Sequence, residues 1–374
     1  MASRDMEILL GADHVTCALG SGSTHVLDAM LDGQCGLVPE TLPGGIAAYV
    51  GRAFPKGADQ HPLEEQLLET VASCRAQLSR DVFAADGREA MRSAVILSTT
   101  KGEIGFLEKG DTTAAFLPAL AERLRIRASL PAAPIVVSNA CASGTLAIKL
   151  AADLIRAGSY DHVLVIGGDL LSRFTLSGFA SLHALSAGPC RPFDRTRDGV
   201  SLGEAVAGVV LSNDRALFKE PLGRYIAGGM GNDANHISGP SRTGEGLVRA
   251  VNAALRAGDK TASDIGHINA HGTGSSYNDR MEAVAFGRLD MEHVPTNSHK
   301  GYFGHTLGAA GVLETILSLH AMHRKQLPAS LGANDLDELP PLNVLQSVGT
   351  PLSNLLLKTS SGFGGCNAAI FIEA

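Results

Sequence analysis

The sequence predicts an α/β protein, and two observations carry this prediction. The 374 residues include 43 glycines and no tryptophan, and 45% are hydrophobic, which is typical of compact α/β proteins with tight turns between strands and helices. Short β-branched runs also alternate with helical patterns along the chain. We expect two similar α/β halves, residues 1–215 and 216–374, as a duplication would give, although the sequence shows no convincing internal repeat.

Charge and composition exclude several classes of function. The net charge is −7 and no long run of like charges occurs, so no nucleic-acid surface is expected. No stretch reaches the roughly 18 uninterrupted apolar residues of a membrane span, and residues 1–21 lack the pattern of a signal peptide. The six cysteines are scattered without CxxC pairs, which argues against a zinc site and a disulfide framework. We expect a cytoplasmic protein without a metal or cofactor.

The strands and helices of the first half are predicted from the periodicity of apolar residues and from glycines that end helices. Residues 38–60 are expected to be irregular. Strands are expected near 7–17, 94–98, 135–137, 162–168 and 205–211, and helices near 23–31, 63–78, 114–123 and 143–158.

The second half repeats this alternation of strands and helices. Strands are expected at 225–227, 268–270, 353–357 and 368–373, and helices at 244–257, 279–286 and 308–322.

A cysteine stands where the strand at 135–137 turns into a helix. Cys141 lies among small residues, and the positive end of a helix at this point favours a thiolate. This is the pattern of a nucleophile elbow. The alternative is a small buried cysteine that packs as a hydrophobe, which is the usual role of a free cysteine.

Three more stretches are rich in small and reactive residues, and each follows a strand or precedes a helix. In open α/β sheets, ligands bind at the carboxyl ends of strands. The stretches are His271–Asp279, Asn297–Gly311 and Ser360–Ala368.

Together with the elbow, these stretches resemble the β-ketoacyl-acyl-carrier-protein synthases, the elongating condensing enzymes of the thiolase fold. The resemblance covers nearly the whole chain, with the motifs in the family's order. It implies a layered α/β/α/β/α core and a decarboxylative condensation of an acyl chain with a malonyl group, both delivered by an acyl carrier protein. The product, a 3-oxoacyl chain, would serve fatty acid, polyene or polyketide biosynthesis.

The resemblance also implies roles for individual residues. Cys141 would carry the acyl chain as a thioester, and its N–H and that of Phe363 would form an oxyanion hole. His271 and His305 would donate hydrogen bonds to the malonyl thioester carbonyl, a task that suits neutral imidazoles. Phe363 would also gate the pocket between the acyl and malonyl sites.

Other residues are implied to support the site. Lys300 and Glu314 would form an ion pair that holds the histidine loop. Asp279 and Glu282 would order the loops of the active site, with a bound cation as an open possibility. The substrate-binding residues would be Thr273, Ser275 and Asn367. We expect His183, His236 and His267 to be surface or satisfied core groups, although residues 233–236 resemble a family segment near the entrance.

Several positions depart from the family's pattern. Ser361, Cys366 and Val200 stand where the family usually has Phe, Thr and Phe, and residues 98–102 lack the usual glycine pattern. These departures leave chain length and substrate preference open.

Two other functions remain as alternatives. A non-catalytic, chain-length-factor-like partner subunit would typically lose the nucleophile, which Cys141 retains. A thiolase acting on coenzyme A esters needs a second reactive cysteine, for which Cys366 is the candidate. The family implies a homodimer, and a heterodimer with a related subunit remains open.

Overall fold

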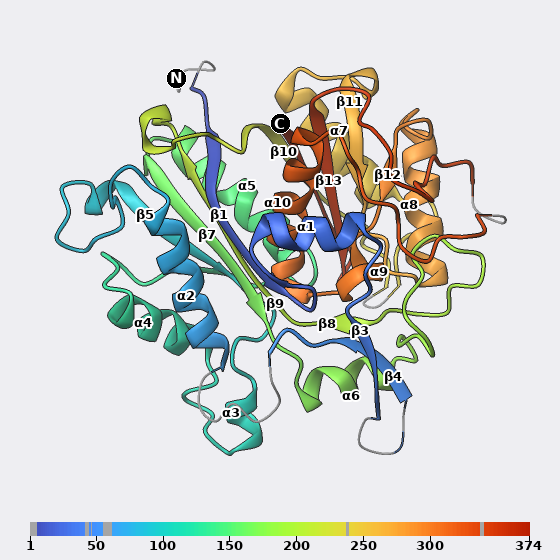
Figure 1. Ribbon diagram of the computed structural model, residues 1–374, viewed down its shortest axis with the longest axis horizontal. Helices are drawn as coiled ribbons and strands as arrows, with labels where there is room; N and C mark the ends of the chain where they lie inside the picture. Colours follow the sequence, from blue (N-terminus) through green and yellow to red (C-terminus); the bar gives the residue numbers. More distant parts are fainter. Residues whose placement is uncertain (1–5, 42–44, 46, 55–61, 237–238, 337–339) are drawn as a thin grey trace.

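The structure is a computed structural model that describes residues 6–41, 45, 47–54, 62–236, 239–336 and 340–374. Its centre is one mixed sheet in which the two halves of the chain lie side by side (Figure 1). The strands of the first half are β1 (Leu9–Cys17), β5 (Ser93–Ser98), β6 (Ile135–Val137), β7 (His162–Asp169) and β9 (Ala205–Ser212). Those of the second are β10 (Gly223–Asn232), β11 (Ile265–Asn269), β12 (Thr296–Asn297), β13 (Leu355–Gly362) and β14 (Cys366–Glu373).

The two halves repeat one strand pattern in mirror order. In the first, β5 pairs in parallel with β6 and β7, and β9 lies antiparallel between β7 and β1. In the second, β11 pairs in parallel with β12 and β13, and β14 lies antiparallel between β13 and β10. The halves join where β1 meets β10, with Leu9 opposite Arg224. The predicted class, two similar α/β halves, is confirmed, and the boundary between residues 215 and 216 stays a prediction.

Helices cover the sheet in layers. Two helices, α2 (Pro62–Ala76) and α4 (Leu117–Arg127), pack on the outer face of the first half, and α7 (Glu245–Gly258) and α8 (Ser276–Arg288) on that of the second. Between the halves lie α5 (Ser143–Arg156) and α10 (Ala310–His323), whose apolar side chains join strands of both halves in one core (Figure 1). The order of layers is therefore α/β/α/β/α, as predicted.

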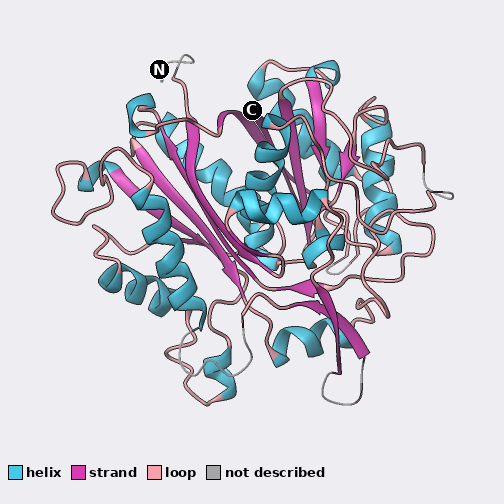
Figure 2. Cartoon of the chain, viewed as in Figure 1, coloured by secondary structure: helices cyan, strands magenta, loops and turns pink. Residues whose placement is uncertain are grey.

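Shorter elements surround this core (Figure 2). They are β2 (Gly20–Ser21), α1 (Ser23–Leu31), α3 (Gly105–Glu108), α6 (Arg173–Ser181) and α9 (Lys300–Phe303). None of the described helices combines the length and apolar content needed to cross a membrane.

The prediction of irregular structure at 38–60 is wrong for two strands. β3 (Leu37–Thr41) and β4 (Ala47–Gly51) form a small sheet with β8 (Leu202–Gly203). Here β4 pairs antiparallel with β3 along its whole length, from Leu37 opposite Gly51 to Thr41 opposite Ala47, and its end also meets β8, with Val50 opposite Leu202. Pro39 weakens the strand pattern of β3 and is tolerated because β3 lies at the edge of this sheet. Residues 42–44, 46 and 55–61 of the predicted segment lie outside the described residues.

Two glycines let the N-termini of α5 and α10 meet backbone to backbone. A β-carbon on Gly311 would lie 2.2 Å from the amide nitrogen of Thr145, and one on Gly144 would lie 2.8 Å from that of Val312. Because no side chain fits between them, the cysteine elbow and the segment that follows His305 are held in direct contact.

This contact predicts a stability effect at Gly311. Gly311→Ala should lower the free energy of unfolding by about 1–3 kcal/mol, because backbone atoms of α5 must move to accept the methyl group. Chemical denaturation measures the loss. The matched control is Gly287→Ala in α8, where nothing lies within 4 Å of the added carbon. An unchanged stability of Gly311→Ala would show that the two helices are not in close contact.

Candidate active site

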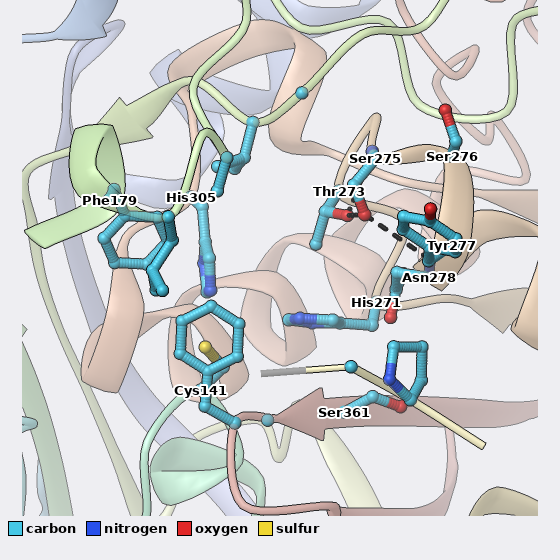
Figure 3. Close-up of a pocket in the computed structure, with 18 of the residues that line it drawn as sticks. Cys141, Phe179, His271, Thr273, Ser275, Ser276, Tyr277, Asn278, His305 and Ser361 are labelled. Atoms are coloured by element: carbon cyan, nitrogen blue, oxygen red, sulfur yellow. Dashed lines mark hydrogen bonds between the residues drawn. The ribbon is translucent and has the colours of Figure 1, made fainter. Parts of the chain in front are cut away.

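A cavity of about 340 Å³ opens where the two halves meet. Its lining includes Cys141 and Phe179 from the first half and His271 and His305 from the second (Figure 3). Four stretches that are far apart in the sequence therefore reach one cavity, as the sequence motifs predict.

The turn before Cys141 is tight and held by its own hydrogen bonds. Ala140 adopts a positive φ of 44°, which a residue with a side chain rarely does. The Ser143 hydroxyl donates to the carbonyl of Ala140 at 2.6 Å and accepts from the amide of Asn139 at 2.7 Å. These bonds place Cys141 at the start of α5 with 7% of its surface exposed.

The thiol of Cys141 is neutral at rest. Burial raises its pKa to about 11, although the charge of Lys300 and hydrogen bonds from the N–H groups of Phe363 and Cys141 itself act in the opposite direction. The prediction of a favoured thiolate is therefore wrong for the resting protein, because desolvation outweighs the helix terminus. The same two N–H groups point at the sulfur and can serve an anion that forms there.

The rings of His271 and His305 meet edge to face, with centroids 5.1 Å apart. Nδ1 of His305 accepts a hydrogen bond from the amide of Leu307 at 3.3 Å, so the proton of the neutral ring is on Nε2. Among the described residues, no partner binds this Nε2. The sulfur of Cys141, one ring nitrogen of His271 and one ring nitrogen of His305 all lie within 4.8 Å of one another. The two rings and the thiol therefore face one another (Figure 3).

Both histidines are neutral over the ordinary pH range. Burial, followed by the charge of Lys300, lowers the pKa of His305 to about 3 and that of His271 well below its usual value. Neutral imidazoles were predicted from the sequence, and burial is the main cause.

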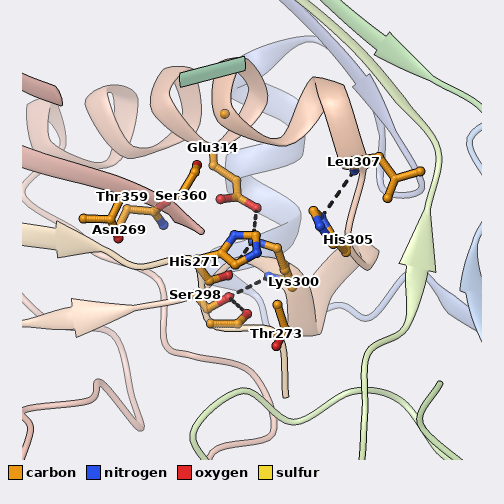
Figure 4. Close-up of polar contacts among 12 residues, drawn as sticks. Asn269, His271, Thr273, Ser298, Lys300, His305, Leu307, Glu314, Thr359 and Ser360 are labelled. Atoms are coloured by element: carbon orange, nitrogen blue, oxygen red, sulfur yellow. Dashed lines mark hydrogen bonds and ion pairs between the residues drawn. The ribbon is translucent and has the colours of Figure 1, made fainter. Parts of the chain in front are cut away.

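Two buried charged groups, Lys300 and Glu314, lie next to His271 (Figure 4), and a third, Lys358, contacts Glu314. Lys300 donates to Glu314 at 2.8 Å and to the carbonyl of His271 at 2.5 Å, so the predicted ion pair is present. Lys358 also binds Glu314. All three side chains are fully buried. The two cations outweigh burial and hold the pKa of Glu314 at about 2, whereas burial lowers that of Lys358 to about 8.

Lys358 is the member of this cluster that the sequence analysis did not identify. The available signal was a lysine directly after the apolar run Leu355–Leu357, within a strand that is buried along nearly its whole length. An ionisable group in such a place needs a partner of opposite charge.

The two acidic residues predicted to order the loops contact backbone. Asp279 accepts from the amides of Thr273, Gly274 and Phe193 at 2.9, 3.1 and 2.7 Å. Glu282 accepts from those of His271 and Gly272 at 2.7 and 2.6 Å. Their oxygens are thus used by the loop that carries His271, and this arrangement gives no support to a cation there.

The predicted substrate-binding residues all reach the cavity. Thr273 and Ser275 line it, with their hydroxyls 2.9 Å apart. Asn367 is almost fully buried and accepts from the hydroxyl of Ser361 at 2.7 Å. Phe363 is 37% exposed and stacks on Phe179, with centroids 5.6 Å apart. The sequence analysis did not identify Phe179.

The other histidines divide into two groups. His183 and His236 are exposed, as predicted, yet both line the cavity. His267 is fully buried, and its Nε2 lies 3.1 Å from the side-chain oxygen of Asn297. Its role in the core agrees with the prediction.

Two of the three departures from the family pattern line the cavity. Ser361 and Val200 do so, whereas Cys366 packs with Ala142 and Ala368 outside the lining.

The group Cys141, His271 and His305 has the donor atoms of a zinc site. However, a histidine that binds a metal through Nε2 carries its proton on Nδ1, and Nδ1 of His305 already accepts a hydrogen bond. The local hydrogen bonding therefore favours a donor nitrogen over a metal ligand.

Comparison with known proteins gives consistent matches. Residues 110–216 match the beta-ketoacyl synthase N-terminal domain, and residues 223–334 match the C-terminal domain. The chain is 36% identical over 253 residues to 3-oxoacyl-[acyl-carrier-protein] synthase 2 of Rhizobium meliloti, covering 63% of this chain and 60% of that protein. It is 35% identical over 253 residues to the ketoacyl synthase alpha subunit of the tetracenomycin polyketide synthase of Streptomyces glaucescens, covering 63% and 58%.

Among solved structures, the ketosynthase ApeO in complex with its chain length factor ApeC, from Xenorhabdus doucetiae, contains a similar chain. The TM-score is 0.88 at 27% identity, over 99% of this chain and 98% of that one. The aligned part thus spans 98% of that one chain, but only about 60% of each of the two sequence relatives.

The buried histidines predict acid sensitivity. Burial lowers the pKa of His267 to about 4, and His271, His299 and His305 are shifted in the same direction. Unfolding lets each of them bind a proton below about pH 6.5, so stability should fall from there towards about pH 4, by about 1.4 kcal/mol per pH unit for each histidine. Glu282, whose pKa burial raises to about 7, acts in the opposite direction but is outnumbered.

The measurement is chemical denaturation across this pH window. His267→Gln should remove about 1.4 kcal/mol per pH unit from the slope, while His183→Gln, a change at an exposed residue, should leave the slope as it is. A slope that does not respond to His267→Gln would show that His267 is already protonated in the folded protein.

Proposed function

Because the chain belongs to the β-ketoacyl synthase family, whose two domains together match more than half of it, we propose that it is a 3-oxoacyl-acyl-carrier-protein synthase. It joins an acyl chain held on Cys141 to a malonyl group on an acyl carrier protein, with loss of carbon dioxide. The observation that carries the proposal is the convergence of a buried thiol, two neutral histidines and two N–H groups in one cavity.

The first step is transfer of the acyl chain to Cys141. The thiol attacks the thioester carbonyl, the bond to the carrier's sulfur breaks, and the proton of Cys141 leaves on the released carrier thiol. His271 can relay this proton, because no hydrogen bond among the described residues fixes its tautomer. The N–H groups of Cys141 and Phe363 stabilise the tetrahedral oxyanion, and such a donor is worth roughly 10²–10³-fold in rate.

The second step is decarboxylation of the malonyl thioester. As carbon dioxide leaves, negative charge develops on the thioester oxygen, which accepts hydrogen bonds from Nε2 of His305 and from His271. The carbanion attacks the acyl carbon on Cys141, the new carbon–carbon bond forms, and the sulfur of Cys141 leaves and regains a proton. Neutral histidines suit this step because they donate without protonating the carbanion.

The carrier arm is assigned to the polar side of the cavity. Thr273 and Ser275 offer hydroxyls to the amides of the arm, and Asn367 supports the loop that carries Phe363. Phe363 acts as the gate, with Phe179 as its stacking partner. Val200 and Ser361 are the side chains that set the space for the acyl chain.

The partner is an acyl carrier protein, and the enzyme works as a homodimer or with a related subunit. Similarity to a chain in the ketosynthase and chain length factor complex supports the arrangement with a related subunit. A cytoplasmic setting fits the six cysteines, all of them unpaired. A purely non-catalytic subunit is disfavoured by the retained Cys141, His271 and His305, and a thiolase by Cys366 lying outside the cavity lining.

Intact-protein mass spectrometry tests the reaction. Incubation with acyl carrier proteins of varied chain length should give an acyl adduct on Cys141, and malonyl-carrier protein should remove it and release a chain two carbons longer. Cys141→Ala should form no adduct. Cys366→Ala is the matched control, because Cys366 is a second buried cysteine but lies outside the cavity lining, and this variant should still react.

Each alternative function has its own signature in this experiment. Condensation that persists with Cys141→Ala in the presence of a related subunit would support the non-catalytic role. Cleavage of acetoacetyl-coenzyme A that needs Cys366, with no reaction of malonyl-carrier protein, would support a thiolase.

The buried lysine predicts a shift in pH dependence. Lys358 is one of the charges that lower the pKa values of His271 and His305. Lys358→Met removes that charge, so both pKa values should rise and the acid limb of the condensation rate should move to higher pH. Lys149→Met, at a lysine paired with Asp153 on α5, is the control and should leave the limb unchanged. If the acid limb of the rate profile is at the same pH in Lys358→Met as in the wild type, another group limits the condensation rate in acid.

A further inference from the structure

We propose that Asp169 is a positioning residue for His305: through the amide of Gly308 it holds the turn that determines which ring nitrogen of His305 carries the proton. The contribution of Asp169 to the reaction rests on the proposed function, whereas its effect on the ring is a property of the fold.

Asp169 ends β7 and is fully buried. Its carboxylate lies outside the cavity lining and accepts five hydrogen bonds, all from two segments of chain. The donors are the amides of Thr100 at 2.9 Å and Gly308 at 2.8 Å, the hydroxyls of Thr99 at 2.9 Å and Thr100 at 2.8 Å, and Nζ of Lys101 at 3.0 Å.

The contact with Gly308 fixes the chain directly after His305. The carbonyl of Gly308 accepts from the hydroxyl of Ser98 at 2.6 Å, so both backbone polar groups of this residue are bound to the ends of β5 and β7. A β-carbon on Gly308 would lie 2.7 Å from Cα of Thr99 and 2.8 Å from the carboxylate of Asp169. The turn is therefore clamped in one place.

The clamp holds Leu307 in an unfavourable conformation. Leu307 has a positive φ of 53°, and a left-handed backbone is unfavourable for a residue with a side chain. This conformation directs the Leu307 amide at Nδ1 of His305, 3.3 Å away. Such strain persists only where neighbouring contacts over-determine the backbone, and the bonds from Asp169 and Ser98 to the next residue provide them.

Lys101 makes this arrangement possible. A fully buried carboxylate without a cation would be costly, and Lys101, 8% exposed, supplies the charge at 3.0 Å. Lys101 lies in the segment 98–102, where the sequence departs from the family's glycine pattern. Within this segment, Lys101 therefore neutralises Asp169.

Asp169→Asn separates this role from general stability. An asparagine offers one acceptor oxygen and introduces an NH₂ donor, so some of the five donors lose their partner. The Leu307 turn should relax, and His305 should no longer be confined to the Nε2–H tautomer. Glu64→Gln is the matched control: it alters a buried carboxylate, bound by Arg123, on α2 of the outer layer.

Nitrogen NMR of the full chain labelled with ¹⁵N-histidine reads the tautomer directly, with the His305 signals assigned by their loss in His305→Gln. The wild type and Glu64→Gln should show a single Nε2–H tautomer, and Asp169→Asn a mixture with Nδ1–H. Gly308→Ala, which displaces the same amide without changing charge, should also give a mixture. If either variant is folded and retains the single tautomer, the proposal is wrong.

Decarboxylation of malonyl-carrier protein supplies the second readout, in a double-mutant cycle. Asp169→Asn should lower the rate of carbon dioxide release about 10- to 100-fold, the usual effect of misplacing one donor, while the yield of acyl adduct on Cys141 stays high. In a His305→Ala background the same change should cost less than about 3-fold, since its effect passes through His305.

Equal losses in both backgrounds would reduce Asp169 to a structural role. A wild type that releases no carbon dioxide would refute the proposed function instead, and the NMR result would still decide whether Asp169 sets the tautomer.

Discussion

The buried cluster of Lys300, Glu314 and Lys358 is the interaction on which the site depends most. It links α9, α10 and β13, and Lys300 also binds the carbonyl of His271, so three elements of the second half and the histidine loop share one set of contacts. Removing one member of a buried ion pair typically costs 3–5 kcal/mol, because an uncompensated charge remains. The same lysines add to the effect of burial in lowering the pKa values of His271 and His305. Packing and electrostatics of the site therefore cannot be altered independently.

Buried carboxylate side chains bind backbone amides near the site, and the reactive side chains are left without such partners. Asp279 and Glu282 take up the amides of the His271 loop, and Asp169 takes up the amide that follows the His305 turn. Each carboxylate satisfies amides that would otherwise be buried without a partner. Because the loops are fixed from behind, Nε2 of His305 can face the cavity without a protein partner, ready for substrate.

Local patterns in the sequence were sufficient for most core elements, whereas the residues that meet in the cavity were predicted from the resemblance of their motifs to a known family. The β-branched run predicts β6 and the small residues after it predict the turn into α5, and the elbow lies at this point of the structure. Both patterns involve only neighbouring residues, so they can be recognised without knowledge of the fold. β3 and β4 were missed because Pro39 weakens the strand pattern, and a proline is tolerated there because β3 lies at the edge of its sheet. The resting state of Cys141 was misjudged because burial is a property of the assembled fold, and Lys358 and Asp169 were not recognised because their partners come from other elements.

The central position of α10 bears on how the chain can fold during synthesis. The five strands of the first half are complete once residue 212 has been made, but one of the two helices that cover their inner face lies about 100 residues later. Until α10 leaves the ribosome, side chains such as Val165 and Val209 lack their final apolar neighbours. At 5–20 residues per second this interval lasts roughly 5–20 seconds. The nascent chain should therefore depend on chaperones that shield apolar sheet surfaces, and expression at a slower rate of initiation should favour soluble product.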